Sequence, residues 1–226
     1  MQVYLIGSGP FDPEFFMTYV AQQATETGDQ NRAFIGVDLG AKRFLDLNVP
    51  IDLAVGDFDS VDAETYARIV ATSKEVEKLE PMKDETDTEH ALGSVAQRYP
   101  GGTYHLFGML GGRVDHLLSN LWLIFQDKFQ AIMEQIHLVD EDNRIHFLKP
   151  GKHTVDRIAG MKYLSFVAMT AVKDLTLANV VYTLQEYQMP TPLALISNEF
   201  LPDVDTMEIS FSEGLILAIQ ARDGQK

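Results

Sequence analysis

The sequence contains no cysteine among its 226 residues. Disulfides, thiolate catalysis and zinc–thiolate sites are therefore excluded, and the absence is in keeping with a reducing cytoplasm. No run approaches the ~20 apolar residues that a membrane span needs. The segment Met1–Ile6 has no basic region and is followed by a turn at Gly7, so we expect no signal peptide. These absences predict a cytoplasmic protein without a membrane partner.

Basic residues are also scarce. The chain has 18 lysines and arginines against 33 aspartates and glutamates, a formal net charge of −15. Such a surface repels nucleic-acid backbones and anionic lipids, which argues against both as partners. An acidic protein that binds a polyphosphate needs local counter-charge, and a divalent cation held by carboxylates is the usual solution. Hydrophobic residues make up 46% of the chain, which is enough for a buried core and excludes disorder.

Short apolar runs alternate with helical patterns over the first part of the chain. The runs are Val3–Ile6, Phe34–Val37, Ile51–Val55, Val76–Leu79, Thr103–Phe107 and His137–Val139. The helical patterns between them are Pro13–Thr25, Ala41–Leu47, Asp62–Ala71, Thr86–Arg98 and Asp115–Phe129. This alternation predicts an N-terminal, mostly parallel Rossmann-like sheet with flanking helices, an α/β fold.

The pattern changes after about residue 144, where no helical period is found. Short apolar runs follow at Ile145–Leu148, Thr154–Ile158, Tyr163–Ala168, Leu175–Leu177, Val180–Leu184, Met207–Phe211 and Leu215–Ala221. Strands of this length, separated by turn residues, are typical of a small antiparallel β-sandwich or barrel, and we predict the sandwich. We therefore place one domain at residues 1–144 and a second at 145–226.

The strongest local feature is the stretch Gly56–Ser60, Gly-Asp-Phe-Asp-Ser, directly after an apolar strand. Residues two apart in an extended segment point to the same side, so Asp57 and Asp59 can share one cation. Ligands of open parallel sheets bind beyond the carboxyl ends of the strands, where this stretch lies. The alternative is a solvated turn in which Asp59 or Ser60 caps the next helix.

A second acidic stretch, Lys83–Asp87, lies between a strand and a helix. Lys83 can contact phosphate, and Asp84 and Asp87 can contact a metal ion or a substrate hydroxyl. The alternative is that the stretch only starts the helix, with Thr86 as N-cap and Glu89 at the reciprocal capping position. For Glu85 and Glu89 we prefer this structural interpretation.

The third feature is a glycine turn followed by polar residues: Gly111, Gly112, Arg113, Asp115, His116 and, one turn further, Asn120. The two glycines let backbone amides approach an anion closely. The planar fork of Arg113 suits phosphate oxygens, and Asp115 and His116 lie at a helix start, which favours a bound anion. The alternative is a plain glycine turn in which Asp115 caps the helix and His116 is exposed.

Two weaker signals follow other strands. Asp38 ends the second apolar run, and Gly7-Ser8-Gly9 after the first can cradle phosphate, although each alone is more often simple turn chemistry. Separate strand ends thus carry Asp or Gly signals, and in this architecture they converge on one side. No Walker lysine motif is present and no GxGxxG follows a strand, so P-loop NTPases and dinucleotide-binding enzymes are disfavoured.

The three aspartate motifs, Gly56–Ser60, Lys83–Asp87 and Gly111–His116, resemble those of thiamine pyrophosphokinases in order and spacing. Ser197–Phe200 and the final run Gly214–Ala221 resemble that family's C-terminal domain. The resemblance implies a nucleotide-binding catalytic domain, a thiamine-binding β-sandwich, and a homodimer with active sites at the subunit interface. It also implies that ATP and thiamine give AMP and thiamine diphosphate, with Mg²⁺ as cofactor.

The resemblance further implies roles for individual residues. Our hypothesis places Mg²⁺ on Asp57, Asp59 and Asp84. Asp87 and Asp115 orient the substrate in this hypothesis, and Arg113 stabilises the charge that leaves with AMP. The predicted binding residues are Asp38, Ser60, Lys83, Gly111, Gly112, His116, Asn120, Ser197 and Asn198, the last two in the thiamine pocket.

The chain departs from the family at two places. Leu39 and Lys42 stand where members often have Gly and Asn after the aspartate equivalent to Asp38. The only tryptophan is Trp122, in the N-terminal domain, whereas some members stack thiamine on a C-terminal tryptophan. The alternatives are a pyrophosphokinase for another hydroxymethyl heterocycle such as a pterin, a non-catalytic thiamine- or nucleotide-binding protein, and a structural α/β protein with acidic turns.

Overall fold

The computed structural model describes residues 1–28, 31–80 and 84–224. The chain divides into two compact units, Met1–Glu141 and Asp142–Lys226. Among the described helices, none is both long enough and apolar enough to cross a membrane.

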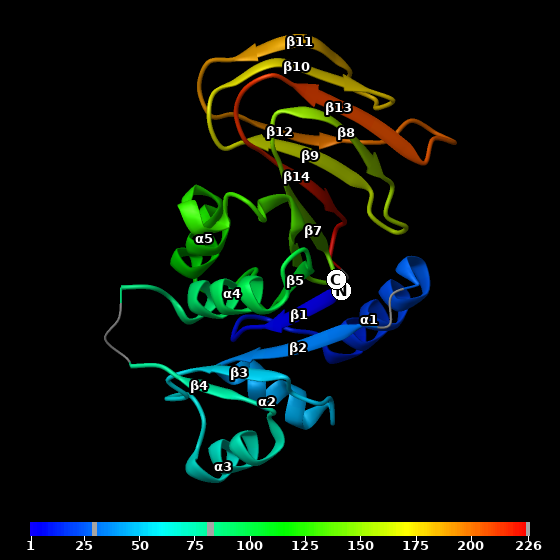
Figure 1. Ribbon diagram of the computed structural model, residues 1–226. Coiled ribbons are helices and arrows are strands. Elements are labelled where there is room, and N and C mark those ends of the chain that lie inside the picture. The colour runs from blue at the N-terminus through cyan, green and yellow to red at the C-terminus, as the bar shows by residue number, and fades with distance from the viewer. Residues whose placement is uncertain (29–30, 81–83, 225–226) are drawn as a thin grey trace. The chain divides into compact units, whose positions relative to one another are not determined.

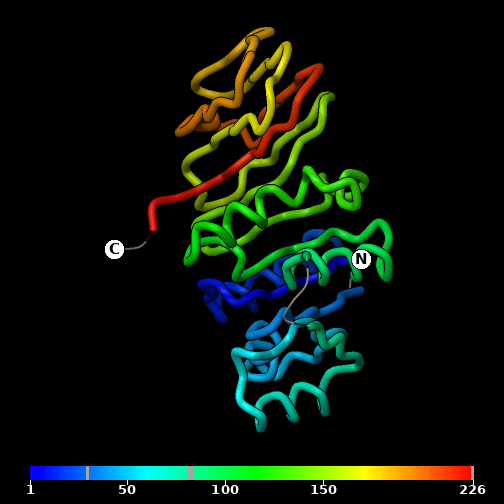
Figure 2. The backbone as a smooth tube through the Cα atoms, turned by 90° about the vertical axis from the view of Figure 1, so that its left-hand side faces the viewer, coloured from blue at the N-terminus to red at the C-terminus, as the bar shows by residue number. Residues whose placement is uncertain are grey.

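The first unit is built on a parallel sheet (Figure 1). Its strands are β1 (Gln2–Ile6), β2 (Arg32–Val37), β3 (Leu53–Gly56), β4 (Val76–Lys78), β5 (Thr103–Phe107) and β6 (Ile136–Val139). They lie in the order β6-β5-β1-β2-β3-β4, and every neighbouring pair is parallel. Figure 2 shows the same order, from the cyan segment around β4 through the blue β1 to the green β5. The chain therefore moves outward from β1 to β4 and returns to β5 on the other side of β1.

Helices connect these strands. They are α1 (Pro13–Thr27), α2 (Leu39–Asp46), α3 (Ala63–Thr72), α4 (Asp87–Arg98) and α5 (Val114–Trp122), followed by 3-10 turns η1 (Leu123–Phe125), η2 (Asp127–Phe129) and η3 (Met133–Gln135). Side chains cap α1, α3 and α4. Asp12 accepts from the N–H of Phe15 at 2.8 Å, Asp62 accepts from the N–H of Thr65 at 2.7 Å, and Thr86 accepts from the N–H of Glu89 at 3.1 Å. Each cap satisfies an N–H that the first helical turn leaves open.

The predicted helix to Phe129 is wrong in its second half, because regular α-helix ends at Trp122. Ile124 and Phe129 are both buried. In a continuous helix they would lie about 140° apart around the axis, on different faces. The backbone becomes extended at Gln126, and this break allows both side chains to enter the core.

The core of the first unit is aromatic around β1. All five residues of this strand are buried, as expected for a central strand covered on both faces. The ring of Tyr4 stacks on Phe34 at 5.6 Å, and Phe16 meets Phe107 edge to face at 5.0 Å. This packing holds β1 rigidly and with it the loop that leaves its carboxyl end.

The second unit consists of two antiparallel sheets that share one core. Its strands are β7 (Asn143–Leu148), β8 (Gly151–Asp156), β9 (Tyr163–Ala168), β10 (Val172–Ala178), β11 (Leu184–Met189), β12 (Ala194–Asn198), β13 (Thr206–Phe211) and β14 (Ile216–Ala221). One sheet has the order β12-β9-β14-β7 and the other β11-β10-β13-β8. The predicted antiparallel sandwich is thus confirmed.

Two strands of this unit were misplaced or missed by the sequence patterns. The strand predicted at Val180–Leu184 begins only at Leu184 and runs to Met189, and β12 was not predicted as a strand. Both lie at sheet edges and most of their side chains are exposed. An edge strand of this kind lacks the alternation of buried and exposed residues on which the prediction depends.

Candidate active site

Acidic residues from three elements meet beside the carboxyl ends of β2 and β3. Asp38 follows β2, and its N–H donates to the carbonyl of Val55 at 2.8 Å. Its carboxyl group is hydrogen-bonded to that of Asp87, the first residue of α4, and Asp57 is close enough to act on it electrostatically. The structure therefore brings Asp38, Asp57 and Asp87 together from distant parts of the sequence.

The surroundings of Asp38 favour a proton on its carboxyl group, because burial and neighbouring negative charge both disfavour its ionised form. Burial is the largest cause that raises the pKa of Asp38 to about 7, and the hydrogen bond and charge of Asp87 add to it. The charge of Asp57 raises this pKa further, whereas the backbone N–H of Phe58 lowers it. The site thus concentrates more negative charge than it can hold without a proton or another cation.

Backbone strain surrounds this pair. Asp38 has φ 49° and Phe58 has φ 59°, values that side-chain-bearing residues rarely adopt. Phe58 is buried, and its ring packs at 5.2 Å from that of Tyr66, so burial offsets a cost of about 1–3 kcal/mol. Gly56 has φ 148°, and a Cβ there would lie 1.8 Å from Oδ1 of Asp38. The turn after β3 is therefore shaped around the Asp38 carboxyl.

Asp59 and Ser60 of the first motif are exposed. The N–H of Asp59 donates to Oδ1 of Asp57 at 3.1 Å, and the hydroxyl of Ser60 donates to Oδ1 of Asp59 at 3.0 Å. Neither Asp59 nor Ser60 caps α3, because Asp62 does so; the capping alternative for these two residues is wrong. Asp84 is exposed, and Lys83 lies outside the described residues.

A divalent cation fits the chemistry of these donors. Within residues 1–28, 31–80 and 84–224, no three His, Asp or Glu side chains are already arranged as a metal site. Mg²⁺ does not need such a cage, since it keeps several waters and binds through few carboxylates together with phosphate oxygens. The raised pKa of Asp38 marks a place where a cation would relieve repulsion. The assignment of Asp57, Asp59 and Asp84 as its ligands stays a prediction.

The glycine turn before α5 has the backbone that glycine alone adopts easily. Gly111 and Gly112 have φ 73° and 69°. Arg113 occupies the N-cap position, and its Nε and Nη2 donate to Asp115 at 3.1 and 2.5 Å. Asp115 therefore does not cap the helix; the guanidinium lowers its carboxyl pKa, and the N–H of His116 donates to the same carboxylate. This ion pair and His116 are exposed, so a phosphate can compete for Arg113.

Asn120 is buried one turn further along α5. Its Nδ2 donates to the carbonyl of Met109 at 2.9 Å. The side chain thus ties the turn before α5 to the helix, which is a structural role. A contact of Asn120 with a ligand stays a prediction.

In the second unit, the two predicted pocket residues differ in their surroundings. Ser197 is exposed with φ 60°, and its N–H donates to Oγ of Ser165 at 3.1 Å. Asn198 is buried. Its Oδ1 accepts from the N–H of Tyr182 and its Nδ2 donates to the carbonyl of Tyr182, both at 2.9 Å. Asn198 therefore holds the neighbouring turn, whereas the side chain of Ser197 remains accessible. Contact of either residue with thiamine stays a prediction.

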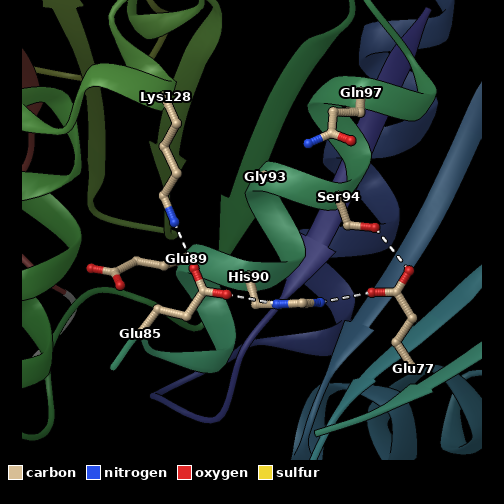
Figure 3. A pocket seen from close by; sticks show the side chains of 8 residues that line it. All are labelled: Glu77, Glu85, Glu89, His90, Gly93, Ser94, Gln97 and Lys128. Atoms are coloured by element: carbon tan, nitrogen blue, oxygen red, sulfur yellow. Dashed lines mark hydrogen bonds and ion pairs between the residues drawn. The ribbon is translucent and has the colours of Figure 1, made fainter. Parts of the chain in front are cut away.

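A second polar cluster lies along α4, around a cavity of about 420 Å³ (Figure 3). His90 is 2.7 Å from Oε1 of Glu85 and 3.0 Å from Oε2 of Glu77, and Lys128 pairs with Glu85 at 2.6 Å. The predicted capping box is confirmed, with Thr86 and Glu89 bonded reciprocally. These pairs fasten the first turns of α4 to β4 and η2.

Arg43 is a further residue of this region that the sequence patterns did not single out. It lies within α2, and its guanidinium donates to the carbonyls of Gly7 at 2.5 Å, Ser8 at 3.2 Å and Gly9 at 2.6 Å. Burial lowers the pKa of this arginine. An arginine inside a helical pattern carries no signal of such a contact, because its partners are far away in the sequence.

Comparison with known proteins identifies the family of the chain. The model of the thiamin pyrophosphokinase catalytic domain matches residues 25–136, and that of the thiamin pyrophosphokinase vitamin B1 binding domain matches residues 152–216. A thiamine pyrophosphokinase of Bacillus subtilis (strain 168) is 31% identical over 198 residues, which are 86% of this chain and 90% of the relative. The chain belongs to the thiamine pyrophosphokinase family.

Solved structures of the family share its fold. A thiamin pyrophosphokinase family protein from Enterococcus faecalis superposes with a TM-score of 0.87 at 33% identity, covering 99% of this chain and 100% of its own. The thiamin pyrophosphokinase of Geobacillus thermodenitrificans gives 0.81 at 27% identity, with 100% and 99% covered. The predicted family, fold class and enzyme class are thereby confirmed: the chain is a thiamine pyrophosphokinase-type transferase.

Proposed function

We propose that this enzyme transfers the diphosphoryl group of ATP to thiamine in a Mg²⁺-dependent reaction that yields AMP and thiamine diphosphate. The observation that carries the proposal is the carboxyl pair of Asp38 and Asp87 beside Asp57. So much negative charge at the carboxyl ends of parallel strands suits a cation that holds a polyphosphate. The names of the matching families support both substrates.

The reaction needs little covalent participation by the protein. The hydroxyl oxygen of thiamine attacks the β-phosphorus of ATP, the bond from that phosphorus to the oxygen of AMP breaks, and the hydroxyl proton passes to a nearby carboxylate or to water. Catalysis then depends on alignment and on neutralising charge. When bound, Mg²⁺ would supply much of that neutralisation.

The chain's own residues have separate roles in this proposal. Asp57, Asp59 and Asp84 hold the cation, and Asp87 and Asp115 orient the substrates. Arg113 exchanges its exposed pairing with Asp115 for a phosphate oxygen and stabilises the charge that leaves with AMP. The residues proposed to contact nucleotide or thiamine are Asp38, Ser60, Lys83, Gly111, Gly112, His116, Asn120, Ser197 and Asn198.

The proposal extends to the organisation of the enzyme. Residues 1–144 bind the nucleotide and carry the catalytic groups, and residues 145–226 bind thiamine, in keeping with the two family models that match these parts. We also propose a cytoplasmic homodimer with active sites at the subunit interface, without nucleic-acid or membrane partners.

The decisive experiment incubates the protein with ATP, Mg²⁺ and thiamine and measures AMP and thiamine diphosphate by chromatography. Equal amounts of the two products are expected, and excess EDTA should abolish both. Replacement of thiamine by a hydroxymethylpterin tests the related pyrophosphokinase activity, and ATP binding without AMP formation would indicate a binding protein.

The metal assignment has its own test. Asp59→Ala or Asp84→Ala should lower turnover by roughly 100-fold or more, the range seen when a charge-stabilising group is removed. Asp46→Ala is the matched control, since that carboxylate is exposed and pairs with Lys42 on the same helix. Wild-type turnover of the Asp59 or Asp84 variant would refute the assignment of that residue.

A further inference from the structure

The loops after β1 and β5 lie at a special place in the sheet. These two strands are neighbours, yet the connection from β1 runs to β2 on one side, and β5 arrives on the other after β4. Such a reversal of strand order opens a crevice beyond the carboxyl ends of the strands, where ligands of open α/β sheets bind. The loops that border it here are Gly7–Gly9 and Gly108–Gly112. A ligand-binding residue is therefore expected on one or both of them.

The two loops are bonded to each other. The N–H of Gly7 donates to the carbonyl of Phe107 at 2.8 Å, and the N–H of Gly9 donates to that of Gly108 at 2.7 Å. A Cβ on Gly9 would lie 2.6 Å from the Gly108 oxygen, so only glycine permits this approach. The first loop thus has one fixed position relative to the second.

Arg43 holds the first loop in place. Its three hydrogen bonds reach three consecutive carbonyls, those of Gly7, Ser8 and Gly9, and its guanidinium lies 5.1 Å from the centre of the Phe11 ring. Gly108 makes room for it, because a Cβ there would lie 2.7 Å from Nη1. Lysine cannot reproduce this arrangement, since its ammonium is a single point of donation rather than a planar fork.

The three hydrogen bonds of Arg43 determine which polar groups of the Gly7–Gly9 loop remain available to a ligand. In a trans peptide the C=O and the following N–H point in opposite directions, so the N–H of Ser8 points away from Arg43 when the carbonyl of Gly7 points toward it. Ser8 is exposed, and neither its N–H nor its hydroxyl bonds to any residue in the described ranges. The carbonyls, which would repel an anion, are turned inward and neutralised. Two donors are left on the outer side of the loop.

We propose that Ser8 binds a phosphate oxygen of the nucleotide through its N–H and hydroxyl, and that Arg43 is the positioning residue that presents them. The proposal rests on the proposed function in one respect, namely that the substrate is a nucleoside polyphosphate. Arg43 itself does not touch the ligand, because its donors are directed at the loop carbonyls.

The test compares four proteins: wild type, Ser8→Ala, Arg43→Lys, and Arg68→Lys as the matched control. Arg68 is exposed on α3, away from this loop. Calorimetric titration with ATP and Mg²⁺ gives the dissociation constant, steady-state kinetics give KM for each substrate, and thermal unfolding gives Tm. Arg43→Lys should weaken ATP binding about tenfold, equivalent to about 1.4 kcal/mol. Ser8→Ala keeps the N–H and should weaken it by about threefold, a single modest hydrogen bond.

The pattern of changes separates positioning from plain stability. KM for ATP should rise in parallel with its dissociation constant, KM for thiamine should stay at the wild-type value, and Arg68→Lys should match the wild type throughout. A lower Tm of Arg43→Lys with unchanged ATP affinity would overturn the positioning role, and unchanged affinity of Ser8→Ala would overturn the contact of the hydroxyl. Should Arg43→Lys fail to fold, Ser8→Ala, which alters only an exposed side chain, still tests whether this loop binds phosphate. Tight ATP binding without thiamine diphosphate formation would refute the proposed function and leave this inference intact.

Discussion

Asp38→Asn replaces a half-buried carboxyl by an amide of nearly the same shape. In the wild type this carboxyl hydrogen-bonds to Asp87, and its pKa is raised to about 7 from 3.8, first by burial and then by Asp87 and Asp57. An asparagine amide donates to the Asp87 carboxylate at every pH. The substitution therefore removes the titration while it retains the hydrogen bond.

The sign of the effect follows from proton binding. Between its unfolded pKa of 3.8 and its folded pKa of about 7, Asp38 binds more protons in the folded protein than in the unfolded one. Its contribution to stability is thus complete below pH 3.8 and is lost as the pH rises through 7. A shift of this size, discounted because the group is partly exposed, corresponds to about 1–2 kcal/mol. At pH 8 Asp38→Asn should be more stable than the wild type by this amount, and at pH 5 the difference should be much smaller.

Urea denaturation at pH 5 and pH 8, with EDTA present, measures these free energies of unfolding. Asp46→Asn is the control, because that carboxylate is exposed and should show no such gain at pH 8. A wild type and Asp38→Asn that differ equally at both pH values would refute the explanation by the raised pKa of Asp38. So would an Asp38→Asn variant that is less stable at pH 8.

Three further substitutions test single contacts in and near the site. Gly56→Ala should lower the free energy of unfolding by more than about 2 kcal/mol, because its Cβ would meet Oδ1 of Asp38 at 1.8 Å at an unfavourable φ; urea denaturation measures it. Gly93→Ala, inside α4 with nothing within 4 Å, should instead stabilise by about 0.5–1 kcal/mol, and a loss there would contradict the reasoning. Asn120→Ala should cost about 1–3 kcal/mol in thermal unfolding, since it leaves the buried carbonyl of Met109 without its donor; an unchanged Tm would show that this bond contributes nothing.

Much of the fold could be predicted because the information is local. Alternating apolar runs and helical periods predicted the parallel strands, including β1, which is buried along its whole length. The capping box of Thr86 and Glu89 involves residues three apart, so the sequence alone identifies it. The edge strand β11 was misplaced and β12 was missed, because their exposed side chains carry no period.

Part of the candidate site could also be predicted from the sequence alone. The order and spacing of the aspartate and glycine motifs determined the family and placed Asp57, Asp59 and Asp84 among the candidates without any coordinates. The sequence by itself also determined that no thiolate chemistry takes part, since the chain has no cysteine.

Only the tertiary structure decided which of these groups meet. The strand order brings Asp38 against Asp87, and burial there raises the pKa of Asp38 to about 7. It also brings Arg43 to carbonyls as far as 36 residues away in the sequence, and so turns the N–H of Ser8 outward. Hydrogen bonds and burial act between neighbours in space, and a pattern along the chain does not specify those neighbours until the sheet has assembled.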